Sequence, residues 1–202
     1  MSDTSDARRV PAGEGRGDVR EKASRFFGFV SRVASPEEAD AFVERLRREH
    51  HDATHVAFAF KIGARGAARV RSSDAGEPSG TAGRPILAAI ESAGMTDAAV
   101  AVVRWFGGTK LGTGGLARAY RLAAERALAS AGSETVYETV AIEVRCPHAR
   151  SGAVRRLLDP PAVRLASERF EPEPVLVLEV RRSRADELER TLTEARLDFR
   201  RI

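Results

Sequence analysis

At residues 102–120 the sequence reads VVRWFGGTKLGTGGLARAY, which has the pattern of a strand, a glycine-rich loop and a helix in direct succession. The strand is expected over residues 98–106, where the run is almost continuously apolar, as in a central strand covered on both faces. The helix is expected over residues 115–130, because apolar residues recur there at helical spacing. A buried strand followed by a packed helix predicts a mixed α+β domain around this stretch.

The rest of this first domain is expected to span residues 21–131. Ser35, Pro36 and Glu38 form a helix start, with serine as the cap, proline in the first turn and glutamate closing a capping box. The expected elements are strands at 24–33, 54–62 and 67–72 and helices at 36–50 and 84–93. Residues 1–20 mix small and charged residues without periodicity and are expected to be a disordered tail.

A second domain is expected over residues 135–202, after a linker at Ala131-Gly132-Ser133. Its strands are expected at 136–146, 163–170, 175–181 and 197–202, with helices at 148–158 and after a Ser183 cap. This βαββαβ order predicts a ferredoxin-like fold. The expected open face of its sheet carries Glu143, Arg145, Glu179 and Arg181 and no aromatic pair, so base stacking is not expected there.

Composition bounds the class of protein. The 202 residues are 43% hydrophobic, enough for one large domain or two small ones. The chain has no apolar run long enough to span a membrane, and its first residues have no signal-peptide core. A single cysteine, Cys146, cannot form an internal disulfide. A cytoplasmic protein without membrane association is therefore expected.

The positive charge is unevenly distributed. The net charge is +4, and residues 61–71 and 104–121 each carry four basic residues and no acid. Such clusters predict an anion-binding surface, although an arginine-rich coding bias is an alternative origin of the charge. No signal specific for DNA accompanies them.

The glycine loop itself has two interpretations. Five glycines in residues 107–115 expose backbone N–H groups, and Lys110, Thr109 and Thr113 add donors in front of a helix N-terminus. This composition favours a phosphate site; the alternative is a tight turn between packed elements. If Gly114 needs a positive φ, Gly114→Val should damage both folding and binding. The spacing excludes a P-loop, and the match to a dinucleotide-binding pattern lacks a second parallel βαβ unit.

A second polar loop reads RSSDAGEPSGTAGRPIL at residues 71–87. Its Asp74 and Glu77 are expected to cap backbone N–H groups or to pair with Arg71 and Arg84, because no nucleophile–base pair or ligand set accompanies them for catalysis. His50, His51 and His55 lack a metal-binding spacing, and no cofactor is expected.

Together the two loops provide the expected binding residues for an anion, RNA or a protein partner. They are Arg71, Asp74, Glu77, Ser79, Thr81, Arg84, Arg104, Gly107, Gly108, Thr109, Lys110, Gly112, Thr113, Gly114 and Arg118.

Both loops resemble the signature segments of the IMPACT family, whose bacterial members are called YigZ-like proteins. The family run Arg-aromatic-aromatic-Gly-Gly-x-Lys-Leu-Gly-x-Gly-Gly-Leu is matched by residues 104–116, and its Ser-Ser-Asp-x-Gly-Glu-Pro-x-Gly-Thr-Ala-Gly-x-Pro run by residues 72–85. Its Glu-His-x-x-Ala-Thr-His segment is matched by residues 49–55. The departures are small: Trp105 stands where Tyr or Phe is common, and Val56 replaces a usual polar residue.

The resemblance implies a first domain like the second domain of ribosomal protein five of the small subunit, and a second domain like the last domain of elongation factor G. Eukaryotic family members control translation initiation by competing for the activator of a stress kinase, and no enzymatic activity is established for the family.

We therefore expect a non-enzymatic protein that acts in translation or its regulation, with RNA, the ribosome or a translation-control protein as its partner. The alternative is an enzyme that binds a nucleotide or phosphorylated substrate in the 107–115 loop.

Overall fold

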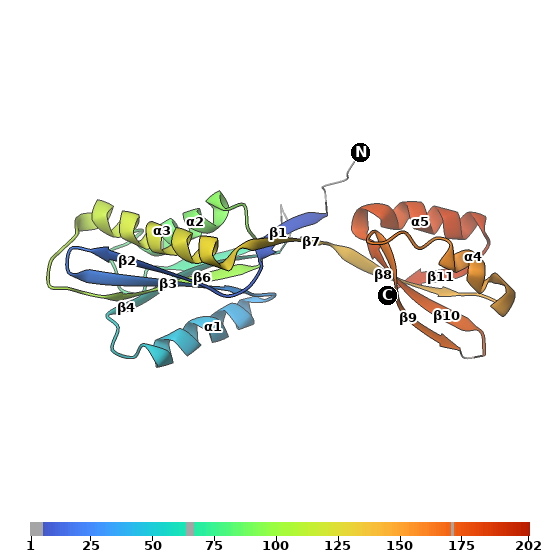
Figure 1. Ribbon diagram of the computed structural model, residues 1–202, viewed down its shortest axis with the longest axis horizontal. Coiled ribbons are helices and arrows are strands. Elements are labelled where there is room, and N and C mark those ends of the chain that lie inside the picture. The colour runs from blue at the N-terminus through green and yellow to red at the C-terminus, as the bar shows by residue number, and fades with distance from the viewer. Residues whose placement is uncertain (1–5, 64–66, 171) are drawn as a thin grey trace. The chain divides into compact units, whose positions relative to one another are not determined.

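The computed structural model describes residues 6–63, 67–170 and 172–202. It is a mixed α/β structure that divides into two compact units (Figure 1). One unit is Arg8–Thr135; the other combines Val136–Ile202 with Asp6 and Ala7. Among the described residues, no helix has both the length and the apolar character needed to cross a membrane.

The first unit is built on a five-stranded antiparallel sheet with the order β2-β3-β6-β4-β5. The strands are β2 (Gly15–Glu21), β3 (Ser24–Arg32), β4 (His55–Ile62), β5 (Arg69–Ser73) and β6 (Ala98–Trp105). The central strand β6 is buried along nearly its whole length, as its continuous apolar run predicts.

Helices cover both faces of this sheet. Helix α1 (Pro36–Glu49) lies on one side, and α2 (Gly83–Ser92) and α3 (Gly112–Ala131) lie on the other (Figure 1). The core under α2 and α3 includes Phe26, Ile86 and Tyr120, and the core under α1 includes Phe42 and Phe58. Strands β4 and β6 therefore send alternate residues to two separate cores.

The predicted start of α1 is confirmed. The Ser35 hydroxyl accepts a hydrogen bond from the Glu38 N–H at 3.2 Å, and Pro36 stands in the first turn. The Glu38 carboxylate in turn accepts the Ala34 N–H at 2.8 Å. Two backbone donors at the helix start are thereby satisfied within the local sequence.

The expected disordered tail at residues 1–20 is wrong for its described part. Residues Ala7–Pro11 form β1, and Gly15–Glu21 form β2, which pairs with β3. Strand β2 is hard to detect in the sequence because the strand contacts α3 through glycine. A Cβ on Gly17 would lie 2.5 Å from the Arg126 Cβ. Close backbone approach replaces the alternating apolar side chains by which a strand is normally detected.

A two-stranded sheet joins β1 to β7 (Ser133–Tyr137). The expected strand at 136–146 is therefore two strands, β7 and β8 (Thr139–Arg145), which separate at Glu138. The expected linker at 131–133 contains the last residue of α3 and the first of β7 instead. The division between the units falls between Thr135 and Val136.

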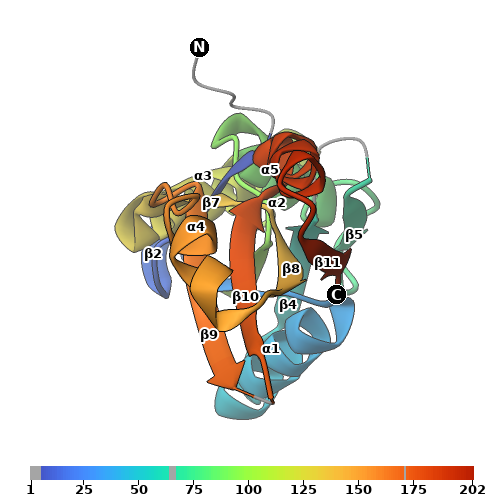
Figure 2. The same ribbon diagram turned by 90° about the vertical axis from the view of Figure 1, so that its right-hand side faces the viewer.

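The second unit has the predicted βαββαβ order of elements. Its antiparallel sheet has the order β11-β8-β10-β9, with β9 at Val163–Phe170, β10 at Pro174–Arg181 and β11 at Asp198–Arg201. A short 3₁₀ turn η1 (His148–Arg150) leads into α4 (Ser151–Arg155), and α5 (Arg182–Glu194) follows β10 (Figure 2). Cys146 is buried in the core of this unit, as expected.

Two details of the second unit differ from expectation. The helix expected at 148–158 is shorter, and Ser183 does not cap α5: its N–H donates to the Asp6 carboxylate at 2.7 Å, a residue distant in sequence. The open sheet face is occupied by ion pairs, since Glu143 binds both Arg169 and Arg200 at 2.8 Å.

Candidate functional site

Three strands of the first unit bring a row of side chains to one end of the sheet. Phe26 on β3, Arg104 on β6 and His55 on β4 are direct register partners, on the face covered by α2 and α3. The loop 74–82 leaves β5 at this end, and the loop 106–111 leaves β6 here. The sheet therefore places the two sequence motifs beside each other.

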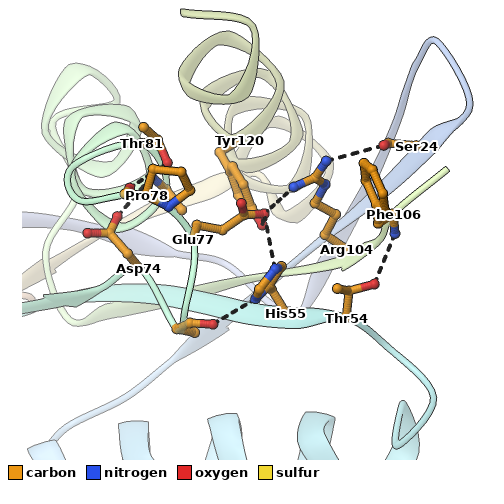
Figure 3. A network of polar contacts seen from close by, with 12 residues as sticks. Ser24, Thr54, His55, Asp74, Glu77, Pro78, Thr81, Arg104, Phe106 and Tyr120 are labelled. Atoms are coloured by element: carbon orange, nitrogen blue, oxygen red, sulfur yellow. Dashed lines mark hydrogen bonds and ion pairs between the residues drawn. The ribbon is translucent and has the colours of Figure 1, made fainter. Parts of the chain in front are cut away.

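A buried ion pair joins these motifs. The Arg104 Nη1 atom donates to the Glu77 Oε1 atom at 2.6 Å (Figure 3). The two side chains are 6% and 3% exposed. The Tyr120 hydroxyl donates to the same oxygen at 2.6 Å, and His55 Nε2 lies 3.9 Å from it. One carboxylate thus connects the polar loop, the central strand and helix α3.

The surroundings hold this network in one arrangement. The guanidinium carbon of Arg104 lies 5.3 Å from the ring centroids of both Phe26 and Phe106. Arg104 also donates to the Ser24 hydroxyl at 3.3 Å (Figure 3). The same hydroxyl accepts the Gly107 N–H at 3.2 Å. Among the described residues, Arg104 Nε is buried without a hydrogen-bond partner. The charges of Arg104 and Glu77 therefore neutralise each other inside the protein.

Tyr120 remains a hydrogen-bond donor in this setting. Burial raises the pKa of the Tyr120 phenol above its ordinary value, and the hydrogen bond to Glu77 raises it further. The phenol is thus protonated at physiological pH, as its role of donor to the carboxylate requires.

Asp74 organises the start of α2. Its carboxylate accepts the N–H groups of Gly80, Ala82 and Gly83 at 2.8, 2.9 and 2.9 Å. Burial by itself raises the pKa of this carboxyl, but the three backbone hydrogen bonds outweigh it and the pKa lies below its ordinary value. The prediction that Asp74 caps backbone N–H groups is confirmed. The same prediction is wrong for Glu77, which pairs with Arg104 and, in the part of the chain that the structure describes, neither caps the backbone nor pairs with Arg71 or Arg84.

The other polar-loop residues lie in different places. Thr81 is buried and donates to the Pro78 carbonyl at 2.7 Å, whereas Ser79 and Arg84 are exposed. Arg71 pairs with Asp40 and lies over the rings of Phe58 and Phe60, in the core beside α1. The structure therefore does not bring Arg71 to the end of the sheet where the two loops meet.

Helix α3 begins earlier than expected, at Gly112. Gly108 and Gly112 have φ values of +83° and +71°, and Gly107 approaches Ala23 so closely that a Cβ would lie 2.1 Å from its carbonyl carbon. Gly114 lies inside the first helical turn and does not have a positive φ, so the condition under which Gly114→Val was expected to damage folding is not met.

An exposed group of donors surrounds the start of α3. Thr109, Lys110, Thr113 and Arg118 are exposed, and the Lys22 ammonium donates to the Lys110 carbonyl at 3.3 Å. No side chain of the described chain caps α3 at Leu111. Backbone N–H groups of a first helical turn lack partners within the helix, so this surface can accept an anion.

The basic clusters seen in the sequence are only partly available to a ligand. Arg104 is buried, Arg121 pairs with Glu125 at 2.7 Å, and Arg71 pairs with Asp40. Arg65 lies outside the described residues. Sequence spacing alone therefore overstated the number of cations in this unit that are both exposed and free of an ion pair within the protein.

His50 and His55 lie on opposite sides of the first unit's sheet. His50 contacts the rings of Phe29 and Trp105, while His55 Nδ1 lies 2.8 Å from the Ala75 carbonyl. Within the described part of the chain no three potential ligands gather to hold a metal.

Sequence reasoning missed Ser24, His55 and Tyr120 as members of the polar network. Tyr120 lies on the buried, apolar face of α3, and nothing in its helical spacing indicates a partner for its hydroxyl. His55 belongs to the 49–55 segment, whose match to a family motif was the available indication.

Comparison with known proteins gives the chain its relatives. The family model for the Impact N-terminal domain matches residues 22–128. An IMPACT family member of Haemophilus influenzae is 32% identical over 174 residues, covering 86% of this chain and 84% of that protein. The IMPACT family member YigZ of Escherichia coli is 36% identical over 138 residues, or 68% of each chain.

A solved structure extends the likeness to nearly the whole chain. A crystal structure of a hypothetical protein, 28% identical, aligns with a TM-score of 0.70 over 96% of both chains. The sequence resemblance drawn from the two loops is thereby confirmed. The protein belongs to the IMPACT family.

Proposed function

We propose that this protein is a non-enzymatic binding protein that acts in translation or its regulation, in the cytoplasm, by contacting RNA phosphates. Membership of a family whose eukaryotic members control translation initiation supports the process. The exposed donors at the start of α3 support the mode of contact. The two acids of the site support a binding role over catalysis, because Asp74 and Glu77 are engaged by protein donors.

We also propose the finer fold assignments. The five-stranded sheet with helices on both faces supports a likeness of the first unit to the second domain of ribosomal protein five. The antiparallel order β11-β8-β10-β9 supports a ferredoxin-like second unit. These likenesses support the ribosome as the setting of RNA contact.

The observation that carries the proposal is the junction of Lys22 and Lys110 beside the α3 N-terminus. The Lys22 ammonium is held against the Lys110 carbonyl, and both side chains are exposed. Two lysines next to unpaired helix N–H groups form a positive point on the surface. A phosphate there gains hydrogen bonds as well as charge contacts.

Lys110→Ala tests this proposal. Binding of ribosomal RNA or tRNA should weaken, and the slope of log affinity against log salt should fall by about one phosphate contact, or about 0.7 for single strands. Stability should change by less than about 0.5 kcal/mol, since Lys110 is exposed. The matched control is Arg190→Ala, an exposed cation on α5. Unchanged affinity in Lys110→Ala, or no RNA binding at low salt, would contradict the proposal.

A second candidate is an enzyme that takes a nucleotide or phosphorylated substrate at the same loop. The uncapped start of α3 favours it to the extent that a small phosphate would fit there. A thermal-shift screen separates the two: stabilisation by ATP, NAD or a phosphate ester, with none by RNA, would favour the enzyme.

A protein partner is the remaining alternative. It would co-purify a translation factor from lysate treated with ribonuclease as well as from untreated lysate.

A further inference from the structure

Part of the sheet face that α1 covers lies open. Helix α1 packs against β4 and β6. Beyond it, Phe27 and Phe29 of β3 and Trp105 of β6 are only half-buried. They are on the opposite face from Phe26 and Val30, which lie in the core under α2 and α3. A cavity of about 380 Å³ lies over these three rings and His50.

The rings form one connected aromatic surface. Trp105 contacts Phe27 edge to face with centroids 5.5 Å apart, and His50 contacts Trp105 in the same way at 5.5 Å. Phe29 lies 5.4 Å from His50. The Trp105 Nε1 donates to the Asp52 carboxylate at 3.0 Å, which fixes the indole orientation in advance. We call Phe27, Phe29, His50 and Trp105 the aromatic face.

Two arginines lie over rings of the aromatic face. The Arg16 guanidinium carbon lies over the Phe29 ring, 5.5 Å from its centroid, and the Arg25 guanidinium carbon lies over the Trp105 ring, 5.3 Å from its centroid. Arg20 is the register partner of Arg25, and Asp18 is that of Phe27. Three exposed cations therefore lie around the rings, against two exposed acids on β2: Asp18 beside Phe27, and Glu21, whose register partner Ser24 lies on the opposite face. Asp52 is already bound to the indole.

We propose that the aromatic face is a stacking surface for the bases of single-stranded RNA, an inference that rests on the proposed function. Aromatic rings accept any base by its π-face, and adjacent arginines bind the phosphates between bases. An apolar protein segment would favour an apolar border, whereas here guanidinium groups cover the rim. The charge pattern therefore selects a polyanion with flat apolar groups.

The aromatic face also continues toward the exposed lysines Lys22 and Lys110 at the start of α3. Lys22 lies in the turn between β2 and β3, three residues before Arg25, and it reaches the Lys110 carbonyl. A single strand that stacks on Trp105 can thus cross this turn and place its next phosphates at the start of α3. The two surfaces form one path for RNA over the end of the first unit.

Trp105 is the only tryptophan in the chain and provides a direct readout. A 12-nucleotide oligo(A) RNA should quench its fluorescence, and an abasic ribose-phosphate oligomer of equal length should quench it far less. Phe27→Leu and Phe29→Leu should each weaken oligo(A) binding about fivefold to a hundredfold, as expected for loss of one stacked base. They should leave binding of the abasic oligomer unchanged. Leu122→Ala, an exposed apolar change on α3, is the control and should alter neither.

Each outcome separates the two ideas. If Lys110→Ala weakens binding but both phenylalanine variants bind oligo(A) and the abasic oligomer like the unchanged protein, the stacking inference is overturned and the proposed function stands. If oligo(A) does not bind at low salt, both fail. Quenching of Trp105 by a purified translation factor, with none by oligo(A), would overturn the inference in favour of a protein partner.

Discussion

At the scale of single residues, Glu77 belongs to a family signature segment, yet its side chain forms a buried ion pair instead of facing solvent. Its Oε1 atom accepts hydrogen bonds from Arg104 Nη1 and from the Tyr120 hydroxyl, each at 2.6 Å, and its side chain is 3% exposed. Glu77→Gln removes the negative charge and leaves Arg104 buried without a counter-ion. The free energy of unfolding of the first unit should fall by about 3 kcal/mol, because an uncompensated buried charge is costly. Denaturant titration followed by Trp105 fluorescence measures this unit specifically.

Glu125→Gln is the matched control for that change. Glu125 pairs with Arg121 at 2.7 Å on the surface of α3, where both side chains are more than 40% exposed. An exposed pair contributes roughly 0.5 kcal/mol or less. Equal losses in the two variants would show that the Glu77 network is not a buried one in solution.

Asp74 predicts a pH dependence. Asp74→Asn should destabilise the first unit by roughly 2 kcal/mol at neutral pH, because an amide replaces a carboxylate that accepts three N–H groups. The folded pKa of Asp74 is lowered, so the advantage of the unchanged protein is complete above the ordinary aspartate value of about 3.9. It should shrink as pH falls through the lowered folded value. Denaturant midpoints from pH 7 to pH 2.5 test this, and a gap that grows toward acid would contradict it.

What the sequence reveals at this scale depends on the range of the interaction. The capping role of Asp74 is local, since its partners lie six to nine residues away, and it was predicted. The Arg104 contact to Glu77 spans 27 residues and the Tyr120 contact spans 43. Neither spacing carries a periodicity that relates the partners, so the network could not be read from the chain.

At the scale of elements, the glycine loop separates glycines needed for packing from those that are not. Gly107→Ala would drive a Cβ to 2.1 Å from the Ala23 backbone and should cost roughly 2 kcal/mol or more. Gly114→Ala places its Cβ 3.5 Å from the Arg118 guanidinium within a helical turn. It should raise stability by about 0.5–1 kcal/mol through helix propensity. Thermal melts of both variants decide; destabilisation by Gly114→Ala would contradict this assignment.

Elements with a clear local sequence pattern were predicted closely. Helix α1 carries its own cap, and β6 its apolar run, so both follow from local sequence. Strand β2 does not, because only Val19 joins the core and Gly15 and Gly17 meet α3 by close backbone approach. The aromatic face was not predicted for a related reason. Residues 24–33 were expected only to form a strand, and the placement of α1, which leaves Phe27 and Phe29 half-buried, does not follow from local sequence.

At the scale of the whole molecule, the N-terminal strands make a testable difference. A chain that starts at Gly13 lacks β1 and keeps β2; a chain that starts at Lys22 lacks both. The second should lose far more stability, because removing β2 uncovers the α3 surface that packs on it. Trp105 denaturation midpoints compare the two. If the chain that starts at Lys22 is as stable as the full chain, β2 contributes nothing to the fold.

The division of the chain was visible in sequence but its origin was not. The small residues at 131–133 marked the neighbourhood of the boundary between Thr135 and Val136. The assignment of Asp6 and Ala7 to the second unit could not be anticipated, because it depends on the Asp6 contacts with Glu138 and Ser183, more than 100 residues away.

That assignment has a consequence for how the protein can be taken apart. Because Asp6 and Ala7 group with Val136–Ile202, the first unit is inserted between two parts of the second, and both of its ends lie in the paired strands β1 and β7. Neighbouring ends allow a domain to be transplanted without opening its fold. The segment Arg8–Thr135 is thus a cassette: placed in a surface hairpin of a host protein, it would carry its own tryptophan reporter with it.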